Sequence, residues 1–215
     1  MRAQKGRLSP TSGQIASRIG ALAAERTRLV RGQATSNRLS LAALDVAERD
    51  GVHAATIDEI CRLAGCSRRT FFHHFPSREA ALLGSAVPTV KPESVARYLA
   101  EPVPILVGAI DLVDIPEEMS LASPLGARRH ALLPTSPELL AAARERMAPA
   151  ATAVLAAVTA KLAQLPGIDR DDIPATAQAI TAIAAALIET AFTTGTIQPS
   201  AAIGHLARIW HQLIH

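Results

Sequence analysis

The sequence TIDEICRLAGCSRRTFFHHF, residues 56–75, predicts two short helices joined by a tight turn. The first begins at Thr56, because a threonine three residues before Glu59 forms a capping box, in which the hydroxyl and the carboxylate each bond an unpaired amide. Gly65 is suited to end this helix, and Ser67 to cap a second helix that the following proline closes. Two helices around a glycine-containing turn have the layout of a helix-turn-helix that reads DNA.

Further helices flank this pair and complete its core. An apolar stripe that ends at Gly51 predicts a preceding helix, and Ser77 is suited to cap a following one. Phe71 and Phe75 are four residues apart, so both can face the core of this unit. The stripe consists of Leu39, Ala42, Ala43, Val46 and Ala47.

The outer face of the second helix carries groups that can meet a DNA major groove. Arginine can fork onto guanine, threonine and aromatic carbons can contact the thymine methyl group, and histidine can bond phosphates. The simpler alternatives are a solvated face for the arginines and capping of the helix C-terminus for the histidines. The residues concerned are Arg68, Arg69, Thr70, Phe72, His73 and His74.

Metal binding and catalysis fit this stretch less well. His73 and His74 are adjacent, so on a helix their side chains point about 100° apart and do not converge on one ion. Cys61 and Cys66 are best interpreted as small, largely buried hydrophobic residues, although a metal or thiol sensor stays open as an alternative. The sequence contains no nucleophile, paired-carboxylate or nucleotide-loop motif. We therefore expect no enzyme, no metal site and no cofactor.

The composition predicts an all-α protein. Hydrophobic residues make up 49% of the 215 residues and aromatic residues only 3%, while Ala, Leu and Ile abound between 14 prolines. The apolar runs fall short of the roughly 20 residues of a membrane span, and no secretory signal is evident. These features predict a cytoplasmic protein whose two cysteines are reduced.

Positive charge is concentrated in the N-terminal part. Residues 1–79 carry 13 Lys and Arg against 7 Asp and Glu, whereas residues 80–215 carry 9 against 12. Clustered positive charge favours binding to a polyanion, although 7 of the 13 positive residues precede Arg38 and can equally form a solvated tail.

The chain divides into three predicted parts. Residues 1–35 form a basic N-terminal extension, with a disordered arm, a possible helix near 13–30 and a linker at 32–37. Residues 36–85 form the helix-turn-helix domain, and residues 86–215 form a larger helical domain.

Prolines cut the C-terminal domain into helices. The last two expose more apolar surface than a monomer covers, so we expect them to form a homodimer interface, with Trp210 buried there. The predicted helices are 93–100, 103–113, 117–131, 137–163 with a kink near Pro149, 174–193 and 200–214.

The sequence from about Leu39 to Leu83 resembles the DNA-binding domain of the TetR family of transcriptional repressors. The resemblance rests on AALDVAERDGVHAATIDEICRLAGCSRRTFFHHFPSREAAL, residues 42–82. It covers about a quarter of the chain. It implies that the remainder is a variable ligand-binding and dimerisation domain.

The resemblance also implies roles for single residues. By position, Thr56 and Arg78 resemble phosphate contacts, Ser67 to Thr70 the base-reading turn, and His73 and His74 backbone contacts. Phe72 departs from the family, because many members have a phosphate-binding tyrosine there. The N-terminal extension is a second departure, and its arginines can either reach along the duplex or form a dispensable tail.

These observations predict a transcriptional regulator, most simply a repressor, that binds a palindromic operator as a homodimer and is released by a small apolar effector. A largely non-specific architectural DNA-binding protein is the main alternative, and an enzyme using His130, Glu117 and Glu118 is another. Apolar residues that can line an effector pocket are Leu106, Ile110, Met119, Met147 and Phe192, for each of which ordinary core packing is the competing interpretation.

Overall fold

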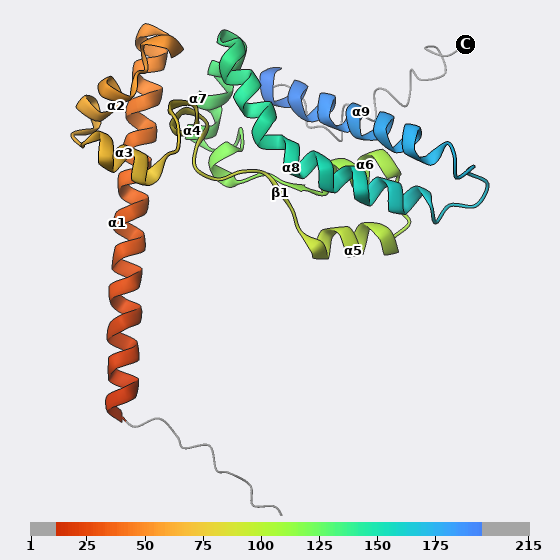
Figure 1. Cartoon of the computed structure of the whole chain (residues 1–215), viewed down its shortest axis with the longest axis horizontal. Helices are drawn as coiled ribbons and strands as arrows, with labels where there is room; N and C mark the ends of the chain where they lie inside the picture. The colour runs from red at the N-terminus through yellow and green to blue at the C-terminus, as the bar shows by residue number, and fades with distance from the viewer. Residues whose placement is uncertain (1–11, 195–215) are drawn as a thin grey trace, which may run out of the picture.

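The computed structural model describes residues 12–194 of the chain. It has a small N-terminal helical unit beside an elongated helical body, and the beginning of α1 projects away from both (Figure 1). The predicted all-α class is confirmed. The described residues add only one short antiparallel pair of strands, β1 (Thr89–Val90) and β2 (Val113–Asp114).

The N-terminal unit closes around aromatic and aliphatic side chains. Phe71, Phe75 and Ile60 are fully buried or nearly so, together with Leu39 and Leu44 of the first helix. The unit consists of α1 (Ser12–Asp50), the short 3₁₀ helix η1 (Val52–Ala54), α2 (Ile57–Ala64), α3 (Arg68–His74) and α4 (Arg78–Leu83).

The first helix is longer than the sequence predicts. α1 runs unbroken from Ser12 to Asp50, so the linker expected at residues 32–37 is wrong. Gly32 costs a helix interior only about 1 kcal/mol relative to alanine, and no proline interrupts this segment. Residues 1–11, expected to form most of the arm, lie outside the described part of the chain.

The body is built from helices whose starts follow prolines or capping serines. The single helix predicted at 117–131 is wrong, because the chain turns between Met119 and Pro124 and a new helix begins with Ser123 as its cap. The elements are α5 (Pro92–Ala100), α6 (Ile105–Asp111), η2 (Glu117–Met119), α7 (Pro124–Leu132), η3 (Leu133–Thr135), α8 (Pro137–Leu162) and α9 (Ile173–Thr194).

Two helices tie the body to the N-terminal unit. Leu132 at the end of α7 and Leu139 at the start of α8 pack into the core of the N-terminal unit. Farther along α8, Val154 and Val158 pack into a second core with α6 and α9. In Figure 1, α8 changes direction partway along its length, in agreement with the kink expected near Pro149.

Salt bridges reinforce this junction from outside. Arg128 of α7 donates to both Asp45 and Glu48 of α1, at 2.6 and 2.7 Å. These ion pairs hold the last part of α1 against α7.

Candidate nucleic-acid interface

The turn between α2 and α3 has the predicted geometry. The Thr56 hydroxyl accepts the Glu59 N–H at 3.3 Å, and the Ser67 hydroxyl accepts the Thr70 N–H at 3.1 Å, so each helix has the expected cap. Gly65 adopts a left-handed conformation with φ +62°, which a residue with a side chain rarely adopts. These contacts set the angle at which α3 leaves α2.

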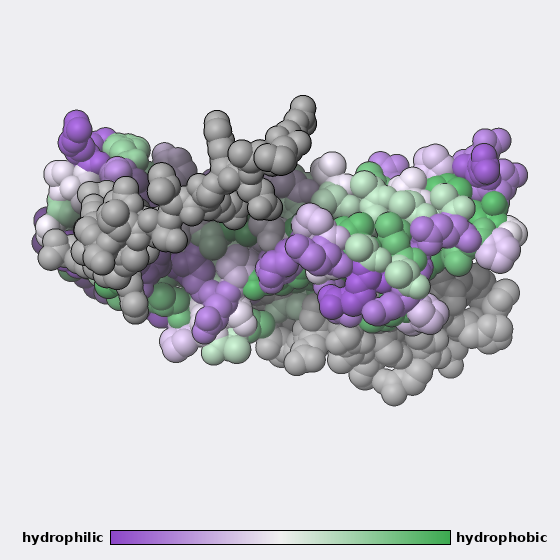
Figure 2. Space-filling model, turned by 90° about the horizontal axis from the view of Figure 1, so that it is seen from below, coloured by the Kyte–Doolittle hydropathy of each residue, from purple (hydrophilic) through white to green (hydrophobic). Residues whose placement is uncertain are grey.

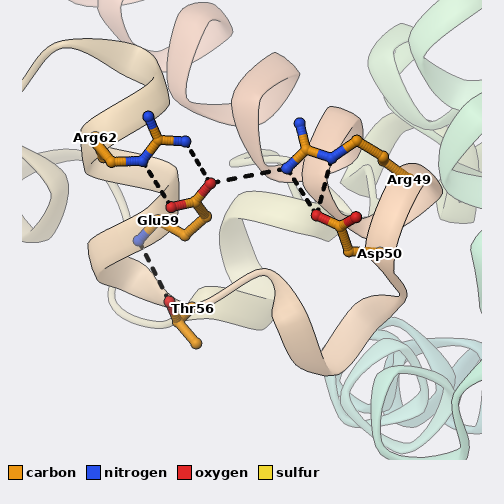
Figure 3. Close-up of polar contacts among 5 residues, drawn as sticks. All are labelled: Arg49, Asp50, Thr56, Glu59 and Arg62. Carbon is orange, nitrogen blue, oxygen red and sulfur yellow. Dashed lines mark hydrogen bonds and ion pairs between the residues drawn. The ribbon is translucent and has the colours of Figure 1, made fainter.

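The second half of the predicted capping box is wrong. The Glu59 carboxylate receives two hydrogen bonds from Arg62, at 2.6 and 2.8 Å, and lies 3.8 Å from the Arg49 guanidinium (Figure 3). The Thr56 N–H donates instead to the carbonyl of Ala54 at 2.7 Å. Charged donors bind a carboxylate more strongly than a neutral amide does, and the bond from Arg62 is the main reason why the pKa of Glu59 is lowered.

The two adjacent phenylalanines of α3 have opposite environments. Phe71 is fully buried, whereas Phe72 is 50% exposed and its ring stands edge-on to that of Phe71, with centroids 5.5 Å apart. Phe75 packs in the core, as predicted. An exposed phenylalanine ring contributes little to folding, so its place on this surface is available for contact with another molecule.

Polar and apolar groups meet around that ring. A shallow depression is lined by Arg69, Thr70, Phe72 and His73. Arg69 and His73 are exposed, while Thr70 is half-buried and hydrogen-bonded to Ser67. The surface thus combines a guanidinium, an imidazole, a hydroxyl and an aromatic edge, the groups that contact base edges and phosphates in DNA complexes.

Two of the predicted DNA-binding arginines form ion pairs within the domain. Arg68 donates to Asp58 of α2 at 2.7 Å, although both side chains are exposed. Arg78 is half-buried, pairs with Glu79 at 2.8 Å and reaches the carbonyl of Val52. Arg78 therefore does not join the surface group on α3.

His74 differs from its neighbour His73. Its ring is half-buried, and burial, followed by repulsion from His73, lowers the pKa of His74 below its ordinary value. The two rings stand edge to face, 5.2 Å apart.

Cys61 lies in α2, and Cys66 lies in the turn that follows it. Cys61 is buried and Cys66 is half-buried, and neither forms a disulfide. Burial, followed by the proximity of Cys66, raises the pKa of the Cys61 thiol to about 11. Within the described part of the chain, no group of three or more His, Cys, Asp or Glu residues is arranged to hold a metal ion.

A second feature is a cavity of about 320 Å³ in the body, bounded mainly by α8 and α9. Met119 and Met147, two of the residues expected to line an effector pocket, are among the residues that line this cavity. Leu106 and Ile110 do not, because they face the core around Tyr98 and Val158 instead. The side chain of Phe192 lies outside the described part of the structure.

Sequence reasoning missed the charged residues of this cavity. Arg129, which belongs to no recognisable sequence motif, lines it and is only 4% exposed. His130, considered only for an enzyme, also lines it, with Nε2 2.6 Å from the carbonyl oxygen of Met119. Arg144 and Glu189 form an ion pair between α8 and α9, at 2.6 Å, on the same cavity. Arg128 and Arg129 are adjacent basic residues, and the local sequence does not indicate that Arg129 is buried.

The helix-turn-helix region matches a known family. Residues 41–83 match the family described as bacterial regulatory proteins, tetR family. No curated protein matches the chain. The matched segment begins in the last part of α1 and ends with α4, so it includes the capped turn and the surface around Phe72.

Proposed function

The chain belongs to the TetR family of bacterial regulatory proteins and is a DNA-binding transcriptional regulator, and we propose that it binds a palindromic operator as a homodimer and responds to a small effector. The observation that carries this proposal is the exposed face of α3, where Arg69, Phe72 and His73 surround one depression behind a correctly capped turn.

Base reading is assigned to the first turns of α3. Ser67, Arg68, Arg69 and Thr70 begin this helix, and the N-terminal residues of a recognition helix are those that contact base edges. Phe72 supplies apolar contact to a thymine methyl group in place of a tyrosine hydroxyl bound to phosphate. Thr56, His73 and His74 lie where phosphates of the same groove are contacted, and Arg78 requires release from Glu79 to join them.

The surface of α9 supports the dimer. Ala175, Ala179, Ala182 and Ala186 are exposed at spacings of four, three and four, so they form one stripe of small side chains along the helix. Ile183 beside it is 37% exposed. A second copy of the chain can approach this stripe closely, and burying it removes apolar surface from water.

A membrane is the competing explanation for such a helix. Among the described helices, α9 is long and apolar enough to span one over Ile173–Ala191, with a mean hydropathy of 1.3, but a single helix of this kind is weak evidence. On the face seen in Figure 2, green apolar surface on the body is interspersed with purple hydrophilic residues. A dimer in the cytoplasm accounts for the exposed apolar face of α9 without a membrane. The second helix expected at the interface, 200–214 with Trp210, lies outside the described residues.

In the dimer, two α3 helices about 34 Å apart enter successive major grooves on one side of the duplex. The cavity in the body is the effector site. An effector that prefers the non-binding arrangement by about 1–3 kcal/mol weakens DNA binding roughly 5- to 150-fold. Release of DNA by the effector makes repression the simplest mode of action.

Selection from a random duplex library by the purified full chain, at physiological salt, tests the proposal. We expect enrichment of an inverted repeat with half-sites one helical turn apart. Tight binding without enrichment supports a non-specific architectural protein instead, and the absence of binding removes the proposal.

A further inference from the structure

Two arginines lie at the junction between the N-terminal unit and the cavity, Arg129 buried and Arg146 half-buried. Arg129 of α7 donates from Nε to the carbonyl of Leu82 at 3.1 Å and from Nη1 to the carbonyl of Glu118. Arg146 of α8 donates from Nη2 to the carbonyls of Gly84 and Ala86, at 2.8 and 2.6 Å. All four acceptors are neutral main-chain oxygens, so neither guanidinium has an ionic partner among them.

The hydrogen-bonding capacity of these guanidiniums is not filled. Nη1 of Arg146 is buried without a hydrogen-bond partner among the described residues. Among the described residues, Arg129 donates only from Nε and Nη1. A buried, unpaired donor on a charged group is costly, so a site of this kind favours an added acceptor.

The local charge is also unbalanced. Glu118 is the carboxylate whose charge acts on both arginines, yet its Oε1 accepts the Ala86 N–H at 2.7 Å and forms no ion pair with either, among the residues described. Burial lowers the pKa of both arginines, which reflects the cost of removing their charges from water. The positive charges of Arg129 and Arg146 are therefore balanced only in part, by the single negative charge of Glu118. Charged groups removed from water are normally paired, so the site carries an excess of positive charge.

Arg129 connects this excess positive charge to the cavity. It lines the cavity next to His130, while the rest of the wall is almost entirely apolar. The other charged residues of the wall, Arg144 and Glu189, already neutralise each other at 2.6 Å. The wall thus combines apolar surface with one arginine, Arg129, that forms no ion pair among the described residues.

We propose that the cavity binds a monocarboxylate with an apolar body, whose carboxylate pairs with the guanidinium of Arg129. This inference rests on the proposed effector site and specifies the chemical class of its ligand. A planar guanidinium matches a carboxylate in a forked geometry. Because Arg129 also holds the carbonyl of Leu82 at the end of α4, a ligand at this position acts directly on the DNA-binding unit.

Calorimetric titration of the full chain with matched probes tests the proposal. Each set shares an apolar body and differs in the head group: octanoate, octanol and octylammonium, and 2-naphthoate, 2-naphthalenemethanol and 2-naphthylmethylammonium. We expect the carboxylate of at least one set to bind at least tenfold more tightly than its alcohol and its ammonium partner. Equal affinity of carboxylate and alcohol in both sets, or preference for an ammonium, overturns the proposal.

A variant then tests the assigned partner. Arg129→Gln should abolish the preference for the carboxylate while leaving the affinity for the alcohol similar, and exposed Arg170→Gln should leave the preference intact. Persistence of the preference in Arg129→Gln overturns the assignment. If Arg129→Gln does not fold, Arg129→Lys keeps the charge and removes the fork, and the proposal requires it to lower carboxylate affinity severalfold with alcohol affinity retained.

A separate DNA measurement distinguishes this inference from the proposed function. Fluorescence anisotropy with the selected duplex is repeated with each probe. Carboxylate binding without DNA release supports the ligand class and removes the effector function. DNA release by carboxylate and alcohol at equal concentrations supports the effector function and overturns the ligand class.

Discussion

Arg68 of α3 donates from Nη1 to Oδ1 of Asp58 in α2 at 2.7 Å, so in the free protein an acidic residue holds an arginine of the proposed recognition helix. Both side chains are more than half exposed. Exposed pairs of this kind contribute about 0–1 kcal/mol to stability, so the pair is easily exchanged for a contact to DNA.

Asp58→Asn is predicted to strengthen DNA binding. The substitution frees Arg68 and removes a negative charge near the phosphates. If Arg68 then neutralises one further phosphate, the slope of log K against log salt becomes steeper by about 0.9. Anisotropy titrations at several salt concentrations measure both effects. Asp111→Asn on the exposed surface of α6 is the control, and an Asp58→Asn protein that behaves like it contradicts the prediction.

The adjacent phenylalanines give a matched pair of variants. Phe71→Ala empties a fully buried site and should cost about 3–5 kcal/mol of unfolding free energy. Phe72→Ala should change stability by about 0.5 kcal/mol or less, because the ring is 50% exposed, yet weaken operator binding by about 1–3 kcal/mol. Urea unfolding and anisotropy separate the two effects. Operator affinity unchanged in Phe72→Ala removes this residue from the interface.

The pKa of His74 predicts opposite effects of acid on folding and on DNA binding. Because the pKa of the folded form lies below the ordinary value of 6.5, the neutral ring stabilises the fold above that pH. This contribution is lost as the pH falls through the folded pKa, since the unfolded chain binds the proton first. Nearby phosphates instead favour the charged ring, so operator affinity should rise over the same range.

Comparison of wild type with His74→Asn isolates these effects from other titrating groups. Between pH 7.5 and 5.5, wild type should lose more stability than the variant and gain more operator affinity. Identical pH dependence of the two proteins in both measurements contradicts the prediction.

Gly84 is predicted to resist substitution, whereas Gly32 is not. Gly84 has φ +94°, and an added Cβ would lie 2.8 Å from Oε1 of Glu118 and 3.0 Å from Cζ of Arg129. Gly84→Ala should therefore cost about 1–3 kcal/mol. Gly32 lies in a helix with open space around the position of a Cβ, so Gly32→Ala should stabilise the protein by up to about 1 kcal/mol. Urea unfolding measures the change in unfolding free energy of both variants. Equal changes in the two variants contradict the prediction.

Local signals made the helix-turn-helix predictable. The caps at Thr56 and Ser67 and the left-handed Gly65 depend only on residues within a few positions, so the sequence suffices for them. The opposite environments of Phe71 and Phe72 follow from helical spacing around the core. Helical spacing also predicted which residues of α3 face outward and form the candidate interface.

Contacts between distant residues were not predictable. Glu59 bonds Arg62 and Arg49 rather than the Thr56 amide, and that choice depends on how α1 and α2 pack. Arg129 is buried and donates to the carbonyls of Leu82 and Glu118, which are distant from it in the sequence, and no local pattern encodes these contacts. The unbroken α1 shows that one glycine is a weak stop signal when the residues on both sides favour helix.

The ratio of affinities for the selected duplex and for a scrambled duplex of equal length, at one physiological salt concentration, tests the central claim most directly. A sequence-reading dimer of this kind predicts a ratio of about 10³ or more. A ratio near one would show that phosphate contacts alone hold the protein to DNA and would contradict the assignment of α3 as a recognition helix.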